Sequence, residues 1–526
     1  MTKHSPSSAI TRRSFLADTG MGFTGLALSA MLFRDGVARA SDDNPPPDGR
    51  PHFPPRAKSV IWIFCCGGTS HVESFDPKPE LNRYAGRNYS ETPYLSEISD
   101  PERFRSVRPV GDGAMVARVT PTEKVMGMIC GSRRFGQSGL EIADCWENIG
   151  SCADDIAIVR SLWTTDNDDG AQMEFHTGRH FREGTFPTIG SWITYGLGTL
   201  NRNLSEYVVL SRAGCGGSKN WGADYVGPAQ AGVLVDAAAR TPISFLTPPT
   251  RRTPQEQTEA FGLVGQLNRL AGVEYPDDQA LQAHIQSYET AFGMQTAVPE
   301  TLQLDRETEA TRRLYGIDRN NGMGRLCLTA RRLVERGVRF VQIFSGGGCA
   351  GGWDYHSGLR QNFLPLARGI DLPIAGLLKD LKQRGMLDET LVVWGTEFGR
   401  TPHGEGNGGG RNHHPYGFSA WLAGGGIKGA SPTAPPMRSA SMPSRIVIMS
   451  PTSMPRCSIN SASIRAAWRC QADDAWNSIS AGRFAKSLPD SANKPKTITC
   501  ASAIACAMMA IRIDQSHSFQ SGTISC

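Results

Sequence analysis

Five short apolar runs most constrain what this chain can fold into. They occupy 59–64, 156–159, 207–210, 340–344 and 391–394. They show little alternation of polar and apolar side chains, which is typical of strands covered on both faces. Helical patterns lie at 255–270, 278–292, 306–315, 324–336 and 372–384, and the last two lead directly into strands. This alternation predicts an α/β fold with a mostly parallel sheet, whose sites lie at the carboxyl ends of strands.

The composition is that of a globular chain, with 39% hydrophobic and 20% charged residues among 526. Its net charge of +5 comes from the two ends, because residues 41–429 hold 40 basic against 44 acidic side chains. A basic stripe for nucleic acid is absent from this sequence, so we expect no nucleic-acid partner.

The N-terminal segment has the three parts of an export signal. Arg12 and Arg13 lie in the twin-arginine motif TRRSFL, an apolar stretch follows at 20–33, and Ala38 and Ala40 form a small-x-small cleavage site. The apolar stretch is too short and too interrupted for a membrane span. We therefore expect a signal peptide over 1–40, the twin-arginine translocase as a partner, and a periplasmic or extracellular protein without an integral membrane segment after cleavage. The alternatives are an uncleaved anchor and a basic N-terminus on a cytosolic protein.

The linker and the cysteines add little to the expected function. Residues 41–57 are polar and rich in proline, so they are predicted to be a linker. Eight of the 13 cysteines precede residue 429. Export permits some of them to oxidise, whereas folding before export works against many disulfides.

The chemistry of the sequence changes after residue 429. The last 97 residues contain 18 Ser, 6 Met and 5 Cys but no Glu. A disordered tail is one interpretation, although Met and Cys at this density are unusual for one. A shifted reading frame accounts for the change better. Residues 444–464 can be encoded by codons that, read from one base upstream, give VENRDHV followed by TDLHATVLHQFGID. We interpret 430–526 as an out-of-frame, unstructured tail.

The first cluster with chemical potential follows the first apolar run, where GGTSH occupies 67–71 and FDPKP occupies 75–79. Glycines allow backbone N–H groups to approach an anion, and Thr69 and Ser70 add hydroxyls. His71 and Asp76 supply an imidazole and a carboxylate nearby. The alternative is an ordinary glycine turn after a strand.

The second cluster combines Asp166 and Asp168 with His176 and His180. Imidazoles four residues apart share one helix face, and the carboxylates come from the preceding loop, which suits metal ligation or a polar ligand. The alternative is a solvated acidic loop with an aspartate that caps the helix. These four residues, with those at 71 and 76, form an additional candidate site.

The third and fourth clusters follow two neighbouring apolar runs. One offers an Asp and a His two residues apart, and the other offers a Glu, an Arg and two His within twenty residues. Carboxylate and imidazole pairs are plausible metal ligands, and the fork of an Arg suits a tetrahedral oxyanion. The glycine-rich loop 404–410 can fold back to bring them together. The residues are Asp354, His356, Glu397, Arg400, His413 and His414.

Taken together, these segments resemble the family of exported bacterial proteins called domain of unknown function 1501, in the alkaline phosphatase/sulfatase-like superfamily. The resemblance covers about 59–429. Its carriers are GGTSH at 67–71, FDPKP at 75–79, EATRRLYG at 309–316, WDYH at 353–356, EFGRTP at 397–402 and WLAGGG at 421–426. The family's ending contains a DLHAT-like segment, which the offset frame restores. The resemblance implies a three-layer α/β/α sandwich, alkaline phosphatase-like, over 58–429 and truncated at its C-terminal end.

The resemblance also implies a metal site at the strand ends, with one or two divalent ions (Zn, Mg, Mn or Ca) that bind the oxyanion and activate the nucleophile. The implied ligands are Asp354, His356, Glu397, His413 and His414. Ser70 or Thr69 would be the nucleophile, and Arg400 would assist.

Several positions depart from the superfamily pattern. No acid follows the first strand, Cys66 lacks the flanking residues of a formylglycine site, and Asp169 stands where the family is expected to have a histidine.

Two functions remain open. One is a metal-dependent hydrolase of sulfate or phosphate esters, acting on a glycan or a small ester, which the frameshift inactivates in this copy. The other is a non-catalytic exported protein that binds a glycan or protein partner on a degenerate superfamily fold.

Overall fold

The computed structural model describes 56–95, 120–201, 203–211, 216–236, 253–274, 292–294, 297–317, 321–347, 351–406 and 409–429. The expected signal peptide, the linker up to residue 55, the helix expected over 278–292 (apart from its last residue) and the tail 430–526 lie outside these residues. Among the helices of the described ranges, none combines the length and apolar character that a membrane span requires.

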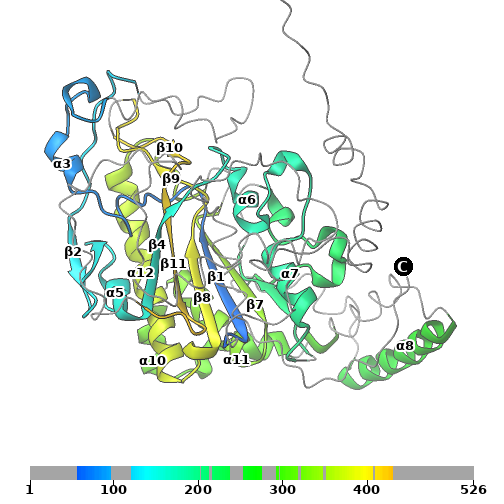
Figure 1. The fold of residues 1–526 in the computed structure, drawn as a ribbon. Coiled ribbons are helices and arrows are strands. Elements are labelled where there is room, and N and C mark those ends of the chain that lie inside the picture. Colours follow the sequence, from blue (N-terminus) through cyan, green and yellow to red (C-terminus); the bar gives the residue numbers. More distant parts are fainter. Residues whose placement is uncertain are drawn as a thin grey trace, which may run out of the picture. The chain divides into compact units, whose positions relative to one another are not determined.

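A seven-stranded sheet in the order β4-β11-β8-β1-β7-β5-β6 forms the centre (Figure 1). The strands are β1 (Ser59–Cys65), β4 (Ile156–Leu162), β5 (Tyr207–Val209), β6 (Val233–Leu234), β7 (Phe340–Ser345), β8 (Thr390–Gly395) and β11 (Phe418–Gly424). All five apolar runs are strands, as predicted. The pairs β1–β7, β1–β8, β5–β7 and β5–β6 are parallel. The sequence pattern missed β11, which lies antiparallel between β4 and β8.

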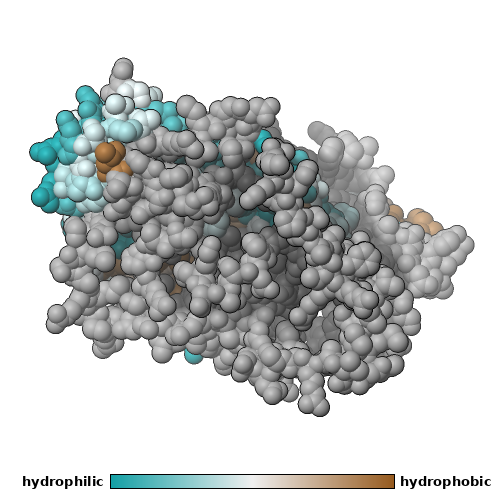
Figure 2. Space-filling view, turned by 45° about the horizontal axis from the view of Figure 1, so that its top comes forward, coloured by the Kyte–Doolittle hydropathy of each residue, from teal (hydrophilic) through white to brown (hydrophobic). Residues whose placement is uncertain are grey.

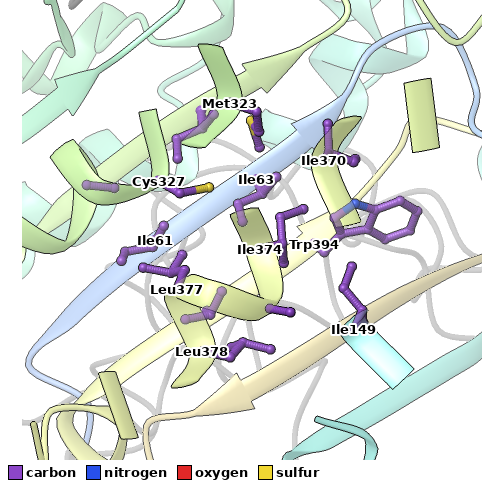
Figure 3. Packing of buried hydrophobic residues seen from close by; sticks show 14 of the residues in the cluster. Ile61, Ile63, Ile149, Met323, Cys327, Ile370, Ile374, Leu377, Leu378 and Trp394 are labelled. Carbon is purple, nitrogen blue, oxygen red and sulfur yellow. The ribbon is translucent and has the colours of Figure 1, made fainter. Parts of the chain in front are cut away.

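Both faces of the sheet are buried, which explains the missing alternation in the strands. On one face Ile61 and Ile63 of β1 belong to a core shared with α11 (Gly322–Glu335) and α12 (Leu359–Gln383), as Figure 3 shows. On the other face Trp62 and Phe64 lie 5.3 and 5.0 Å from the Phe175 ring of α6 (Ala171–Thr177). Figure 1 shows α12 and α6 on opposite sides of the strands. Each such large side chain contributes about 1.5–3 kcal/mol by burial.

The helices follow the expected pattern with one clear difference. α8 (Pro254–Glu274), α10 (Glu309–Leu314) and α11 lie where helices were predicted. The helix expected over 372–384 is longer, because α12 begins at Leu359 and continues through Pro365 and Pro373. Proline disfavours a helix interior by removing a hydrogen bond. The apolar face of α12, which buries Phe363, Ile370 and Ile374 in the core, offsets that cost.

Shorter elements complete the described chain. The remaining helices and strands are α3 (Glu80–Tyr84), α5 (Glu147–Gly150), α7 (Ile189–Leu197), β2 (Ser132–Phe135), β3 (Leu140–Ala143), β9 (Gly399–Arg400) and β10 (His413–His414). The 3-10 turns are η1 (Tyr89–Glu91), η3 (Ala153–Asp155), η4 (Phe181–Glu183), η5 (Gly217–Asn220), η6 (Asp224–Val226), η7 (Pro228–Gln230), η8 (Leu304–Arg306) and η10 (Leu387–Glu389).

A small satellite core lies around α3. Leu81, Tyr84 and Tyr89 pack with Val125 away from the main sheet. The outward side chains of this region are polar, and Figure 2 shows the visible described surface there as mainly hydrophilic. The segment is therefore held by its own apolar cluster beside the 120–129 stretch.

Strand direction decides which loops can meet. Parallel β1, β7 and β8 direct their carboxyl ends to one edge of the sheet. Because β11 is antiparallel to β8, its first residue lies at that same edge, directly after β10. The loops after β1, β7 and β8 and the segment before β11 therefore converge there.

Candidate metal centre

Three predicted ligands meet at this edge. Asp354 Oδ1 lies 2.9 Å from His356 Nε2 and 3.1 Å from His413 Nε2, and the two imidazole nitrogens are 3.1 Å apart. Asp354 and His356 follow β7, whereas His413 is the first residue of β10. They form a group of ligand atoms that all lie within 4.8 Å of one another.

The outer nitrogens of both rings are held by acceptors. His413 Nδ1 lies 2.7 Å from the Asn167 carbonyl oxygen, and His356 Nδ1 contacts the Glu405 carboxylate. A carbonyl and an ionised carboxylate only accept hydrogen bonds, so we assign the proton of each ring to Nδ1. Each neutral ring then directs the lone pair of Nε2 toward Asp354 Oδ1. Partners of this kind on the outer nitrogen are characteristic of metal-ligating histidines.

The separations also fit a cation. With bonds of about 2.1 Å, ligand atoms at right angles around an ion lie about 3 Å apart. The observed 2.9–3.1 Å therefore matches one face of an octahedral shell. A divalent ion between the three converging acceptors would offset their mutual repulsion, so the residues present fit such an ion.

The ionisation of the triad points in the same direction. Burial disfavours the charge of Asp354, but its contacts with His356 and His413 and the charge of Arg400 hold its pKa well below the usual range. Burial lowers the pKa of His413, whereas contact with the Asp354 carboxylate raises the pKa of His356. The group is thus a fixed negative charge with two nitrogens directed at it.

Local geometry positions Asp354. Gly351 has φ +74, and a Cβ there would lie 2.2 Å from the Cys66 carbonyl oxygen, so the chain passes β1 at a distance that only glycine permits. The next anchor is Trp353, whose N–H donates to the same carbonyl at 3.0 Å and whose buried ring stacks on Trp146. Asp354 follows this anchor directly.

Arg400 is the centre of the framework around the triad. It is 1% exposed and donates to the Gly68 and Arg411 carbonyls at 2.8 and 3.0 Å, to the Gly67 carbonyl, and to Asp354 Oδ1 at 2.5 Å. Four of its five N–H groups are therefore used within the protein. This geometry makes Arg400 a positioning residue that links the β1 turn to Asp354, rather than a free fork for an oxyanion.

Glu397 lies in the same framework but outside the triad. Its Oε1 accepts the Gly67 N–H at 2.6 Å, and its Oε2 accepts the Thr396 hydroxyl at 2.9 Å. The glycine turn after β1 thus binds an anion, as the sequence suggested, but the anion is a carboxylate of the chain itself. Burial raises the pKa of Glu397.

Asp169 is a further acid at this edge that was not among the predicted ligands. Burial raises its pKa to about 7, and the charges of Glu397 and Asp354 add to the shift. It lies on the loop after β4, two residues beyond Asn167, which contacts the triad.

Of the two proposed nucleophiles, the Ser70 hydroxyl is engaged elsewhere, whereas the Thr69 hydroxyl is buried without a hydrogen bond to another oxygen. The Ser70 hydroxyl donates to Glu73, a fully buried carboxylate that pairs with Arg411 at 2.7 Å. The hydrogen bond from Thr69 to the Thr396 hydroxyl, at 2.9 Å, comes from its backbone N–H, and its own side chain, 1% exposed, lies beside the Cys65 thiol. Neither side chain is shown to face the triad.

The remaining residues of the first cluster have structural partners. His71 Nδ1 lies 3.4 Å from the Arg400 N–H, and its ring stacks on His414 at 6.2 Å. Asp76 pairs with Lys78 at 2.8 Å. The ring of His414 also packs on Tyr416 and does not join the triad.

The second cluster is divided by the fold. α6 ends at Thr177, so His180 lies beyond the helix and the two imidazoles do not share a helix face as expected. His176 lies among aromatic rings, 4.5 Å from Phe64, with Nδ1 on Asn220 at 3.1 Å, so it is a core residue. Asp166 Oδ2 lies 3.6 Å from His180 Nε2 in the interior, and burial raises the pKa of Asp166 to about 7. Asp168 is exposed and accepts the Asp169 N–H.

Four buried histidines have lowered pKa values, with burial as the first cause in each. They are His71 (about 3), His176 (about 4), His403 (about 3) and His414 (about 4). All four are therefore neutral in the folded protein at neutral pH.

Sequence reasoning missed the residues that hold the ligands. Glu405 lies within the glycine-rich loop, and Asn167 contributes only its backbone carbonyl, so no pattern of side chains signals either role. Glu73 lies between two segments that were singled out, but its partner Arg411 is 338 residues away.

Two comparisons with known proteins bear on the chain. No curated protein matches the chain. The family model described as "Protein of unknown function (DUF1501)" matches residues 57–433, which is more than two thirds of the sequence. The chain therefore belongs to the DUF1501 family.

Proposed function

We propose that this protein is an exported, divalent-metal-dependent hydrolase of sulfate or phosphate esters, built on an alkaline phosphatase-like three-layer sandwich. One observation carries the proposal: two imidazoles, each fixed through its outer nitrogen, direct Nε2 at the carboxylate of Asp354. Three protein ligands leave positions for substrate, which is typical of catalytic rather than structural metal sites.

The residues of the chain have separate tasks in this proposal. Asp354, His356 and His413 hold the ion, Glu405 and Asn167 fix the two rings, and Arg400 keeps Asp354 against the β1 turn. When bound, a divalent ion supplies charge stabilisation at an ester oxygen and activates a nucleophile. Two imidazoles and one carboxylate favour a transition metal over magnesium or calcium, and their arrangement on one octahedral face suits ferrous iron as well as zinc.

The location is proposed from the N-terminal motif. Arg12 and Arg13 direct the folded protein to the twin-arginine translocase, and cleavage after Ala40 releases it. A sulfated or phosphorylated glycan or a small ester would be met outside the cytoplasm.

Metal analysis of the purified full chain tests the centre. We expect about one equivalent of ion in the wild type and its loss in Asp354→Asn and His413→Ala. Asp388→Asn, which changes an exposed aspartate in η10, is the matched control and should keep the ion. Elemental analysis should cover zinc, manganese, iron, magnesium and calcium. A wild-type protein that binds none of these would contradict the proposal.

Turnover of p-nitrophenyl sulfate and p-nitrophenyl phosphate tests the hydrolase. We expect the frame-corrected chain to release nitrophenol, and this release should stop with a chelator and in Asp354→Asn, whereas the chain that ends in 430–526 should give little turnover. Sequencing the gene across codons 425–435 comes first, because a corrected frame gives a second chain to assay.

A second function is favoured by the engaged hydroxyl of Ser70 and the used donors of Arg400. A non-catalytic exported protein that binds a glycan or a protein partner needs the metal centre but no nucleophile. Stoichiometric metal and glycan binding without ester turnover, in both frames, would select this function over the hydrolase.

A further inference from the structure

Cys130 and Cys145 lie opposite each other at the open end of the β2–β3 hairpin. The register pairs Ser132 with Ala143, and the Asp144 N–H donates to the Gly131 carbonyl at 2.9 Å, so the ladder continues one step further. The next facing pair is Cys130 and Cys145. Their sulfur atoms are 3.8 Å apart.

The backbone at this position suits a cross-strand bond. Since residues 131 and 144 share the ladder hydrogen bond, the cysteines form a non-hydrogen-bonded pair, whose Cα atoms lie about 4.5 Å apart. Disulfides span Cα separations of about 4.4–6.8 Å. The sulfurs can therefore approach to bonding distance without a rearrangement of the strands.

The other described cysteines lack this arrangement. Cys65, Cys66, Cys152 and Cys327 are buried, whereas the hairpin pair is only partly buried. Burial raises the pKa of the Cys65 and Cys327 thiols. In the hairpin pair, the contact between the two thiols lowers the pKa of Cys130 and raises the pKa of Cys145, so Cys130 is the more readily ionised partner. Among the described cysteines, Cys130 and Cys145 thus combine partial solvent access with facing positions on two strands.

The pair lies against the framework of the metal centre. Cys145 Sγ donates to the Glu73 carbonyl at 3.4 Å, and the Trp146 indole donates to the same oxygen at 3.0 Å. The carboxylate of Glu73 holds Arg411, which also donates to the Gly127 carbonyl. A bond between the cysteines would therefore fix the β2–β3 hairpin against the segment that carries Glu73 and its partner Arg411.

We propose that Cys130 and Cys145 are joined by a disulfide bond in the mature protein. The bond forms by exchange with a disulfide-bearing oxidant. One cysteine thiolate attacks a sulfur of the oxidant, and the second displaces that sulfur from the mixed disulfide. One S–S bond forms and one breaks, two electrons pass to the oxidant, and the two protons from the cysteines end on its two thiols.

The test uses the full chain, incubated with oxidised glutathione and digested without reductant. We expect a cross-linked peptide that contains Cys130 and Cys145, lighter by two hydrogens than the reduced pair. The sequence separation of 15 residues predicts that reduction raises the unfolding equilibrium constant by about 100-fold. Hydrogen exchange of the β2–β3 hairpin should also become faster after reduction.

The double variant Cys130→Ser/Cys145→Ser is the matched control, and reductant should leave its stability unchanged. If both thiols stay open to alkylation after the incubation, the proposal fails. Recovery of Cys130 joined to any other cysteine also overturns it. The peptide result on the wild type decides the matter even if the variant does not fold.

Discussion

The buried ion pair between Arg411 and Glu73 offers the sharpest test of the framework around the centre. Both side chains are 0% exposed, and Arg411 donates to Glu73 through Nε and Nη2, with the shortest separation at 2.7 Å. The same guanidinium donates to the Thr401 and Gly127 carbonyls at 3.1 and 3.0 Å. One side chain thus connects four segments of the chain.

Arg411→Met keeps most of the volume but leaves the Glu73 carboxylate buried without a counter-charge. Removing one partner of a buried pair costs about 3–5 kcal/mol, which is a large share of the roughly 5–15 kcal/mol available to a domain. Glu73→Gln should cost less, because three backbone carbonyls still accept from Arg411. The double variant removes both charges, so it should be less destabilised than the sum of the singles by about 2–3 kcal/mol.

The assay is urea unfolding followed by tryptophan fluorescence and circular dichroism, with chelator present so that metal binding does not contribute. Arg133→Met is the control, because Arg133 and its partner Glu147 are 50% and 73% exposed and such pairs contribute at most about 1 kcal/mol. Additive effects of the two substitutions, within about 0.5 kcal/mol, would refute the argument that the pair acts as a unit.

Three further predictions follow from the geometry. Gly68→Ala should destabilise the protein by about 2–4 kcal/mol in urea unfolding, because φ is +68 and a Cβ would lie 2.1 Å from the Phe398 ring. Gly86→Ala is the control: φ is +80 but nothing lies within 4 Å, so it should cost only the backbone strain of about 1–2 kcal/mol. The four buried histidines take up protons near pH 6.5 only when unfolded, so the unfolding free energy should fall from about pH 6.5 toward pH 4, by up to about 1.4 kcal/mol per pH unit for each. Urea unfolding across this pH range measures the dependence of the unfolding free energy on pH. In His176→Gln this dependence should be weaker by the contribution of about one proton. Glu405→Gln should weaken metal binding about tenfold by calorimetry, because it loosens one ligand ring, while Glu389→Gln, 52% exposed on its side chain, should leave it unchanged.

Most strands of the sheet could be predicted because burial on both faces requires apolar side chains at successive positions, which is visible within each short run of the sequence. The run at 59–64 lacks alternation since Ile61 and Trp62 contact different helices on opposite faces. β11 has the same apolar character in FSAWLAG, but it follows a stretch of loops without an intervening helix, so the α/β pattern gave no place for it. The two prolines of α12 show the opposite case, in which packing overrides a local signal.

The candidate site divides in the same way. The sequence by itself determined that carboxylates and imidazoles follow two neighbouring strands, because residue type and distance from a strand end are local properties. It therefore predicted Asp354, His356 and His413 as ligands, together with residues that have other partners in the fold.

Only the tertiary structure decided which polar groups face one another. Glu397 accepts from Gly67, 330 residues away, and Arg400 uses its donors on the same turn, so two predicted site residues serve the framework. His413 reaches Asp354 because an antiparallel strand begins at the edge where the parallel strands end. A buried donor must find an acceptor, but the partner is chosen by strand order and close approach in space, which no local pattern of the sequence encodes.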